Sequence, residues 1–182
     1  MKLVLVILIT AFSFGAANAQ DHLALKAGTA NKLAGLSLPR GFAFQELALP
    51  PEMAGEPGVT KLRIYALESK NPKYKILISH TRFLEVDVTP KIFKGAEGAM
   101  LTPLKSSARS GFKTTTTPLL RRGLKGNLTS LRLLTNLGGG NDHFDVYAFY
   151  AKNSIWFITF MSPSAERLAK LSKGFMSEVK LP

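Results

Sequence analysis

Apolar and polar residues alternate along much of this chain, which is the pattern of strands with one buried face. In residues 61–68 (KLRIYALE), apolar residues occupy every second position. A turn signal at Asn71-Pro72 separates this strand from the next, so we predict that the two pair antiparallel. The same criteria predict strands at residues 42–46, 61–68, 74–83, 112–118, 128–137, 142–152 and 155–161.

Two segments carry apolar residues at helical spacing. The first starts at Thr89-Pro90, an N-cap residue followed by proline at the first helical position, and extends to Ser110. Thr102-Pro103 repeats this start signal, so we expect either one kinked helix or two abutting helices. The second helix follows Ser162-Pro163, its predicted cap. Its predicted buried stripe is Leu168, Leu171, Phe175 and Val179.

The order of these elements predicts an α+β fold, in which an antiparallel sheet is flanked by helices. Residues 50–58 are expected to form a loop and residues 121–127 a glycine-containing turn. Residues 39–182 are predicted to form a single α+β domain. Residues 20–38, which are rich in Ala and Leu, are predicted to be an N-terminal arm or linker.

Residues 1–19 are predicted to be a secretory signal peptide. A lysine gives a positive start, Leu3–Phe14 is almost entirely apolar, and Ala17-Asn18-Ala19 places small residues at a cleavage point. The apolar run is shorter than the roughly 20 residues of a membrane-spanning helix. Cleavage after Ala19 would leave Gln20–Pro182 in the periplasm or outside the cell. The absence of cysteine excludes disulfides, thiolate metal sites and a cysteine-linked lipid anchor.

The chain is strongly basic, with 24 Lys and Arg against 12 Asp and Glu. An excess of this size favours anionic partners or surfaces. For an exported protein we therefore predict an anionic envelope component or an acidic protein as the partner, with peripheral contact to a membrane surface. Nucleic acid is not expected as a partner, because residues 113–132 contain no aromatic side chain on which bases could stack.

Positive charge is concentrated between Glu97 and Asp142, an interval without any acidic residue. Three of its cations crowd the predicted turn at 121–127, where side chains project into water. The predicted anion- or partner-binding residues are Arg121, Arg122, Lys125 and Arg132. The alternative interpretation is that these charges only keep the surface soluble.

A glycine run precedes the predicted strand at 142–152, in the stretch LGGGNDHFDVYAFY. It matches neither the dinucleotide-binding pattern nor the P-loop, because the required third glycine and the Gly-Lys-Ser/Thr group are missing. Asn141, His143 and Asp145 fall on one strand face, where they could hold a divalent ion weakly. The other interpretation is a hairpin whose turn uses the glycines. We predict no metal site and no cofactor.

The layout of the chain resembles the PsbP-like fold, a group that includes the extrinsic subunit of photosystem II and periplasmic proteins of the DcrB type. The stretches that carry the resemblance are LPRGFAFQE, the strand pair 61–83, the helix after VTPKIF, GFKTTTTPLL, HFDVYAFYAKNSIWFITFMSP and the final FMSEVKLP. The resemblance implies an α/β/α sandwich around an antiparallel sheet. It also implies a role in binding or assembly without catalysis.

These observations together predict an exported, non-catalytic binding or accessory protein with a basic surface for an anionic envelope component or a protein partner. No catalytic residue is predicted, because the chain has neither a Gly-x-Ser-x-Gly elbow nor a cysteine nucleophile. The alternative function is a metal-dependent hydrolase that uses Asn141, His143 and Asp145.

Overall fold

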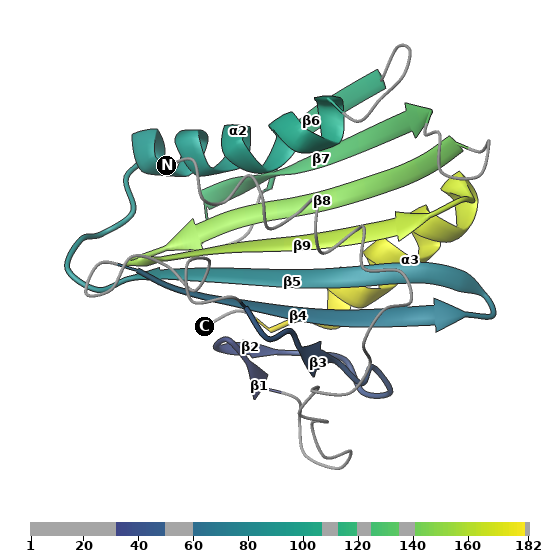
Figure 1. The fold of residues 1–182 in the computed structure, drawn as a ribbon, viewed down its shortest axis with the longest axis horizontal. Helices are drawn as coiled ribbons and strands as arrows, with labels where there is room; N and C mark the ends of the chain where they lie inside the picture. The colour runs from purple at the N-terminus through teal and green to yellow at the C-terminus, as the bar shows by residue number, and fades with distance from the viewer. Residues whose placement is uncertain (1–31, 50–59, 107–112, 120–124, 135–140, 181–182) are drawn as a thin grey trace.

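A computed structural model of the protein describes residues 32–49, 60–106, 113–119, 125–134 and 141–180. Within these residues, seven strands form one antiparallel sheet in the order β3-β4-β5-β9-β8-β7-β6, and two short strands form a separate hairpin (Figure 1). The elements are β1 (Lys32–Leu33), β2 (Leu36–Ser37), β3 (Gln45–Glu46), β4 (Thr60–Lys70), β5 (Lys73–Phe83), α2 (Pro90–Ser106), β6 (Lys113–Pro118), β7 (Lys125–Leu134), β8 (Asn141–Ala151), β9 (Ser154–Ser162) and α3 (Ala165–Glu178). The predicted α+β class is therefore confirmed.

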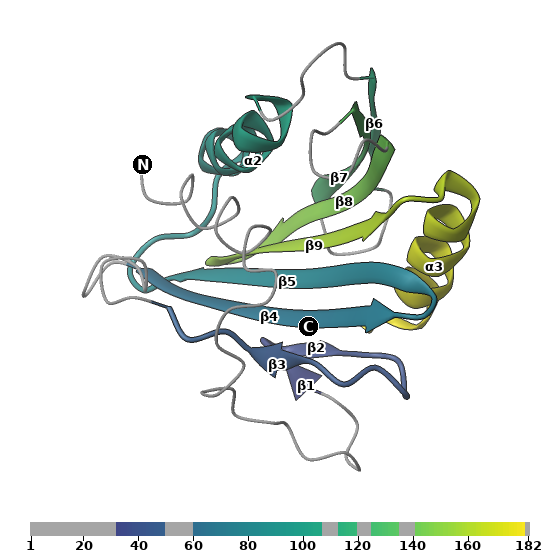
Figure 2. The same cartoon turned by 45° about the vertical axis from the view of Figure 1, so that its right-hand side comes forward.

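Alternate side chains of the sheet enter two separate hydrophobic cores. On one face, residues such as Ile158 pack with Phe175 of α3. On the other face, residues such as Phe157 pack with Met100 of α2. Strands β8 and β9 are buried on both faces because the two helices lie on opposite sides of the sheet (Figure 2).

Helix α2 is continuous, with Pro103 inside it. Of the two predicted alternatives, a single helix is thus the one observed. Its N-terminus is capped as predicted, because Thr89 Oγ1 accepts the backbone N–H of Ile92 at 3.3 Å. Pro103 and Leu104 are both buried on the side of the helix that faces the sheet.

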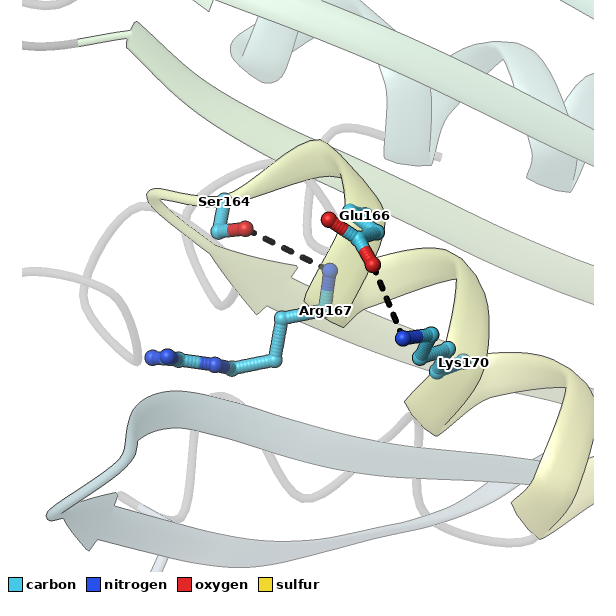
Figure 3. A network of polar contacts seen from close by, with 4 residues as sticks. All are labelled: Ser164, Glu166, Arg167 and Lys170. Atoms are coloured by element: carbon cyan, nitrogen blue, oxygen red, sulfur yellow. Dashed lines mark hydrogen bonds and ion pairs between the residues drawn. The ribbon is translucent and has the colours of Figure 1, made fainter.

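The N-cap of helix α3 lies two residues later than Ser162, the predicted cap (Figure 3). Its N-cap is Ser164, whose Oγ accepts the backbone N–H of Arg167 at 3.3 Å. Ser162 instead ends β9 and accepts the N–H of Ser164 at 3.2 Å. Glu166 lies in the first turn, where its charge suits the helix dipole, and pairs with Lys170 at 2.8 Å across one turn of the exposed face.

Residues 32–38, assigned from sequence to an arm or linker, pack into the core as a hairpin. Leu33 and Leu36 are buried on the α3 face of the sheet and pair across the turn. Ala34 and Gly35 both have positive φ, at 51° and 82°, which is the geometry of a two-residue type I′ turn. Trp156 Nε1 donates to the Ala34 carbonyl at 2.9 Å and ties the hairpin to β9.

The strands predicted at 61–68, 74–83, 112–118, 142–152 and 155–161 are confirmed, and β4 and β5 pair antiparallel across Asn71-Pro72. The prediction of a strand at 42–46 was too long, because β3 contains two residues, while Phe42 and Phe44 pack edge-on against Phe175. The predicted turn at 121–127 was wrong for its last three residues, which already belong to β7. The predicted loop at 50–58 lies outside the described residues.

Strand β6 is the last strand of the sheet on the side opposite β3. It pairs with β7 over its full length, and most of its side chains are exposed. The outer edge of the sheet is short, because β6 has only 6 residues, and it lacks one donor, because Pro118 at its end has no N–H.

Gly126 on β7 gives a test of this packing. A Cβ at this position would lie 2.6 Å from the Cα of Phe149 and closer still to the carbonyl oxygen of Ala148. We therefore expect Gly126→Ala to lower the free energy of unfolding by about 1–3 kcal/mol, measured by urea denaturation. Gly174→Ala in α3 is the matched control, because nothing lies within 4 Å of its Cβ, and it should raise stability by about 0.4–1 kcal/mol. Equal effects of the two substitutions would contradict the register of β7 against β8.

Candidate functional site

A pocket of about 360 Å³ lies between α3 and the outer strands β6, β7 and β8. Its strand wall is made by side chains on the sheet face that α3 covers. In Figure 2, α3 stands beside the ends of β8 and β9, and β6 and β7 form the outer part of the sheet. The residues that line the pocket place it between this helix and these outer strands.

Three cross-strand rows make up this wall, because residues opposite one another in an antiparallel pair share a face. The basic row is Lys113, Arg132 and His143; the polar row is Thr115, Ser130 and Asp145; and the apolar row is Leu128 and Tyr147. Successive rows are about 7 Å apart, since two residues advance a strand by that distance. The wall thus changes from basic to apolar along the strands.

The permanent cations of the pocket come from three elements. Lys113 lies on β6, Arg132 directly opposite it on β7, and Lys173 on α3, and all three side chains are exposed. Among the described residues, no carboxylate lies within ion-pairing distance of any of them, although ion pairs form elsewhere, as between Lys75 and Glu68 at 3.4 Å. The pocket therefore carries positive charge that is available to an anion.

Asp145 is the carboxylate of the pocket, and two serine hydroxyls bind it. Ser130 Oγ donates to Oδ1 at 2.6 Å from β7, and Ser172 Oγ donates to Oδ2 at 2.7 Å from α3. Ser172 is almost fully buried, at 1% exposure. The carboxylate therefore links two strands and a helix, and its hydrogen bonds explain a half-buried charge beside a hydrophobic core.

The helix wall of the pocket follows from the periodicity of α3. Ala165, Leu168, Ala169 and Ser172 are spaced three and four residues apart, so they lie on one side of the helix. Leu168 continues into the core around Phe160 and Phe175, whereas the two alanines are exposed and leave room at the pocket.

The four binding residues predicted from sequence do not form one cluster. Arg132 lines the pocket, but Lys125 starts the same strand seven residues earlier, about 23 Å away by strand rise. The odd separation also puts Lys125 on the face of α2, opposite Tyr150. Arg121 and Arg122 lie outside the described residues. The structure instead brings Arg132 together with Lys113 and Lys173.

Sequence inspection missed Lys113, Lys173 and the two serines as parts of one site. Lys113 lies within the acid-free interval between Glu97 and Asp142, but its position opposite Arg132 depends on the register between β6 and β7. Lys173 and Ser172 lie about 40 residues beyond Arg132 in the chain, in a helix whose sequence pattern indicated only its buried stripe.

The residues of the alternative interpretation, a weak metal site, are only partly placed together. His143 and Asp145 face the same pocket, as their parity predicts. Asp145 is already bound by the two serines, and the side chain of Asn141 is outside the described part of the structure. Within the described residues, no group of three His, Cys, Asp or Glu side chains has the spacing of a metal site.

His80 lies outside the pocket on β5, where its ring stacks on Trp156 with centroids 5.1 Å apart. Burial, together with the nearby positive charges of Arg63 and Arg82, lowers the pKa of His80 from 6.5 to about 4. This imidazole is therefore neutral at physiological pH and adds no positive charge to the sheet.

No protein-family profile, curated protein sequence or solved structure matches the chain. The class of this protein therefore rests on its fold and its pocket: it is an α+β domain with a basic pocket at one end of an antiparallel sheet. The resemblance to PsbP-like proteins stays a prediction. In the described part of the chain, neither helix combines the length and apolar content that crossing a bilayer requires.

Ser172→Ala tests the link through Asp145. Removing a buried donor to a charged acceptor should lower the free energy of unfolding by about 1.5–3 kcal/mol in urea denaturation. Ser177→Ala is the control in the same helix, because its exposed hydroxyl bonds only to the Gly174 carbonyl, and it should change stability by less than about 0.5 kcal/mol. A loss no larger for Ser172→Ala than for Ser177→Ala would show that the hydrogen bond from Ser172 to Asp145 does not stabilise the fold.

The pKa of His80 can be read from an NMR titration of the histidine ring protons, with His80→Gln to assign the signal. We expect a value of about 4. Because the unfolded histidine titrates near 6.5, the stability that neutral His80 contributes is present above that pH and is lost as the pH falls toward 4. Urea denaturation of His80→Gln should show a shallower loss across this window, whereas a His80 signal titrating near 6.5 would contradict the burial.

Proposed function

We propose that this chain is an exported, non-catalytic binding or accessory protein that recognises an anionic component of the cell envelope. The observation that carries this proposal is the basic row, in which Lys113 and Arg132 lie directly opposite each other without a carboxylate partner among the described residues. Like charges in this arrangement repel, so an anion bound between them would relieve an unfavourable interaction.

The remaining parts of the proposal rest on the sequence. The signal-peptide pattern of residues 1–19 supports export, and the net positive charge of the chain supports attraction of anions over longer distances. Helices on opposite faces of an antiparallel sheet support the proposed PsbP-like sandwich.

A non-catalytic role is supported by the chemistry of the pocket. Its carboxylate accepts hydrogen bonds from Ser130 and Ser172, and this arrangement anchors α3 to the sheet. The exposed side chains around the pocket are those of Lys113, Arg132, Lys173, Thr115 and two alanines, which suit holding an anion in place.

Vesicle binding tests this function. Mature protein, residues 20–182, should be retained on vesicles that contain phosphatidylglycerol and not on pure phosphatidylcholine vesicles, and retention should fall as salt rises from 50 to 300 mM. Arg132→Gln should lower the partition coefficient about fivefold, as expected for the loss of one cation near the surface, about 1 kcal/mol.

Lys125→Gln is the matched control, since it removes the same charge from the far end and the other face of β7. We expect a change smaller than twofold. If Lys125→Gln weakens retention and Arg132→Gln does not, the surface around the start of β7 is the binding surface, and the pocket is not. Retention that is equal on both vesicle types and insensitive to salt would overturn the function itself.

A further inference from the structure

We propose that the ligand of the pocket is an amphiphilic organic anion, with its anionic group at the basic row and an apolar chain or ring along the apolar row and α3. This inference rests on the proposed anion-binding function and specifies the class of ligand. It follows from the order in which the rows of the wall occur along the strands.

The basic row positions the headgroup. Lys113 and Arg132 project from neighbouring strands, and Lys173 adds a third cation from α3. Arg132 can bind two oxygens of a phosphate or carboxylate in its plane, and the lysines add charge from either side. Three elements thus surround one anionic group.

The polar row limits how far the anion can enter. Asp145 lies one row further along the wall, and its negative charge is held there by Ser130 and Ser172. An anion moved to this row would meet a like charge in a partly buried place, which is unfavourable. The headgroup therefore stays at the basic row, and the part of the ligand that passes Asp145 must be uncharged.

The apolar row continues into the hydrophobic core. Tyr147 is buried at 6% exposure and packs edge-on against Phe160 with centroids 5.9 Å apart. Leu128 is partly buried against the same core, and Leu168, a core residue of α3, lines the pocket from the helix side. From the basic row to the apolar row the wall runs about 13 Å, since the two are four residues apart along the strand.

The size of the pocket sets the size of the ligand. A volume of about 360 Å³ is near the lower end of the range for small-molecule sites. This space accommodates a headgroup with a short alkyl chain or one ring, or the first part of a longer chain. Displacing water from the half-buried Leu128 and the exposed Ala165 and Ala169 would add a hydrophobic contribution that a bare anion cannot obtain.

Isothermal titration of mature protein with three matched probes tests the inference. Octyl phosphate, below its micellar concentration, should bind at least tenfold more tightly than inorganic phosphate, which lacks the chain, and octanol, which lacks the charge. Arg132→Gln should raise the Kd for octyl phosphate at least fivefold, with Lys125→Gln changing it less than twofold.

A second pair of variants tests the apolar part of the pocket. Ala169 is an exposed residue of α3 that lines the pocket, so Ala169→Phe should fill the space without disturbing the core. We expect a Kd for octyl phosphate at least fivefold higher and an unchanged Kd for inorganic phosphate. Ser177→Phe places the same ring on an exposed part of α3 outside the pocket and should leave both values unchanged.

The outcomes separate this inference from the function on which it rests. If phosphate binds as tightly as octyl phosphate and Arg132→Gln weakens both, the anion-binding function stands and the amphiphilic ligand is wrong. If octanol binds as tightly as octyl phosphate and Arg132→Gln has no effect, the pocket takes apolar molecules, and both proposals fail for this site. If octyl phosphate does not bind while Arg132→Gln still weakens retention on vesicles, only the amphiphilic ligand is wrong.

A final comparison distinguishes the source of the anion. Dihexanoyl phosphatidylglycerol, also below its micellar concentration, presents the same phosphate within a lipid headgroup. Binding tighter than that of octyl phosphate identifies a membrane lipid, and weaker binding identifies a free amphiphile. Binding of dihexanoyl phosphatidylcholine equal to that of the anionic lipid would overturn the requirement for net negative charge.

Discussion

The hydrogen bonds of Asp145 are the constraint on which the shape of the candidate site depends. Its carboxylate accepts hydrogen bonds from Ser130 on the neighbouring strand and from Ser172 on the last helix. These bonds, in addition to the hydrophobic contacts, position α3 against the sheet. A charge held at this depth also divides the pocket into a basic end and an apolar end. Structural anchoring and selection of a ligand therefore depend on the same side chain.

The positive charge of the chain is organised by the sheet more than by the density of Lys and Arg in the sequence. Strand alternation sends Arg132 and Lys125 to opposite faces, although both come from the same short basic interval. Pairing of β6 with β7 brings Lys113 opposite Arg132, and the return of the chain through β9 adds Lys173. The cations that cluster in the structure are therefore Lys113, Arg132 and Lys173, which are far apart in the sequence.

The sequence predicted the strands and helices well where one local signal dominates. Alternation defined β4 and β5, and the threonine and proline at 89–90 defined the start of α2, because these signals depend only on neighbouring residues. The hairpin at residues 32–37 escaped prediction, since each of its strands is two residues long and is held by distant partners such as Trp156. The pocket could not be predicted for the same reason, because it requires the register of three strands and the docking of a helix.

The edge strand β6 gives the pocket a further property. It is short and exposed and ends in Pro118, which makes it a poor template for a strand from another molecule, while the strand itself is held to the sheet by β7 alone among the described residues. An anion bridging Lys113 and Arg132 would strengthen the pairing of β6 with β7. Occupancy of the pocket would then reduce the fraying of β6. It would thereby also reduce exposure of the edge of β7, with which a strand of another copy of the chain could pair.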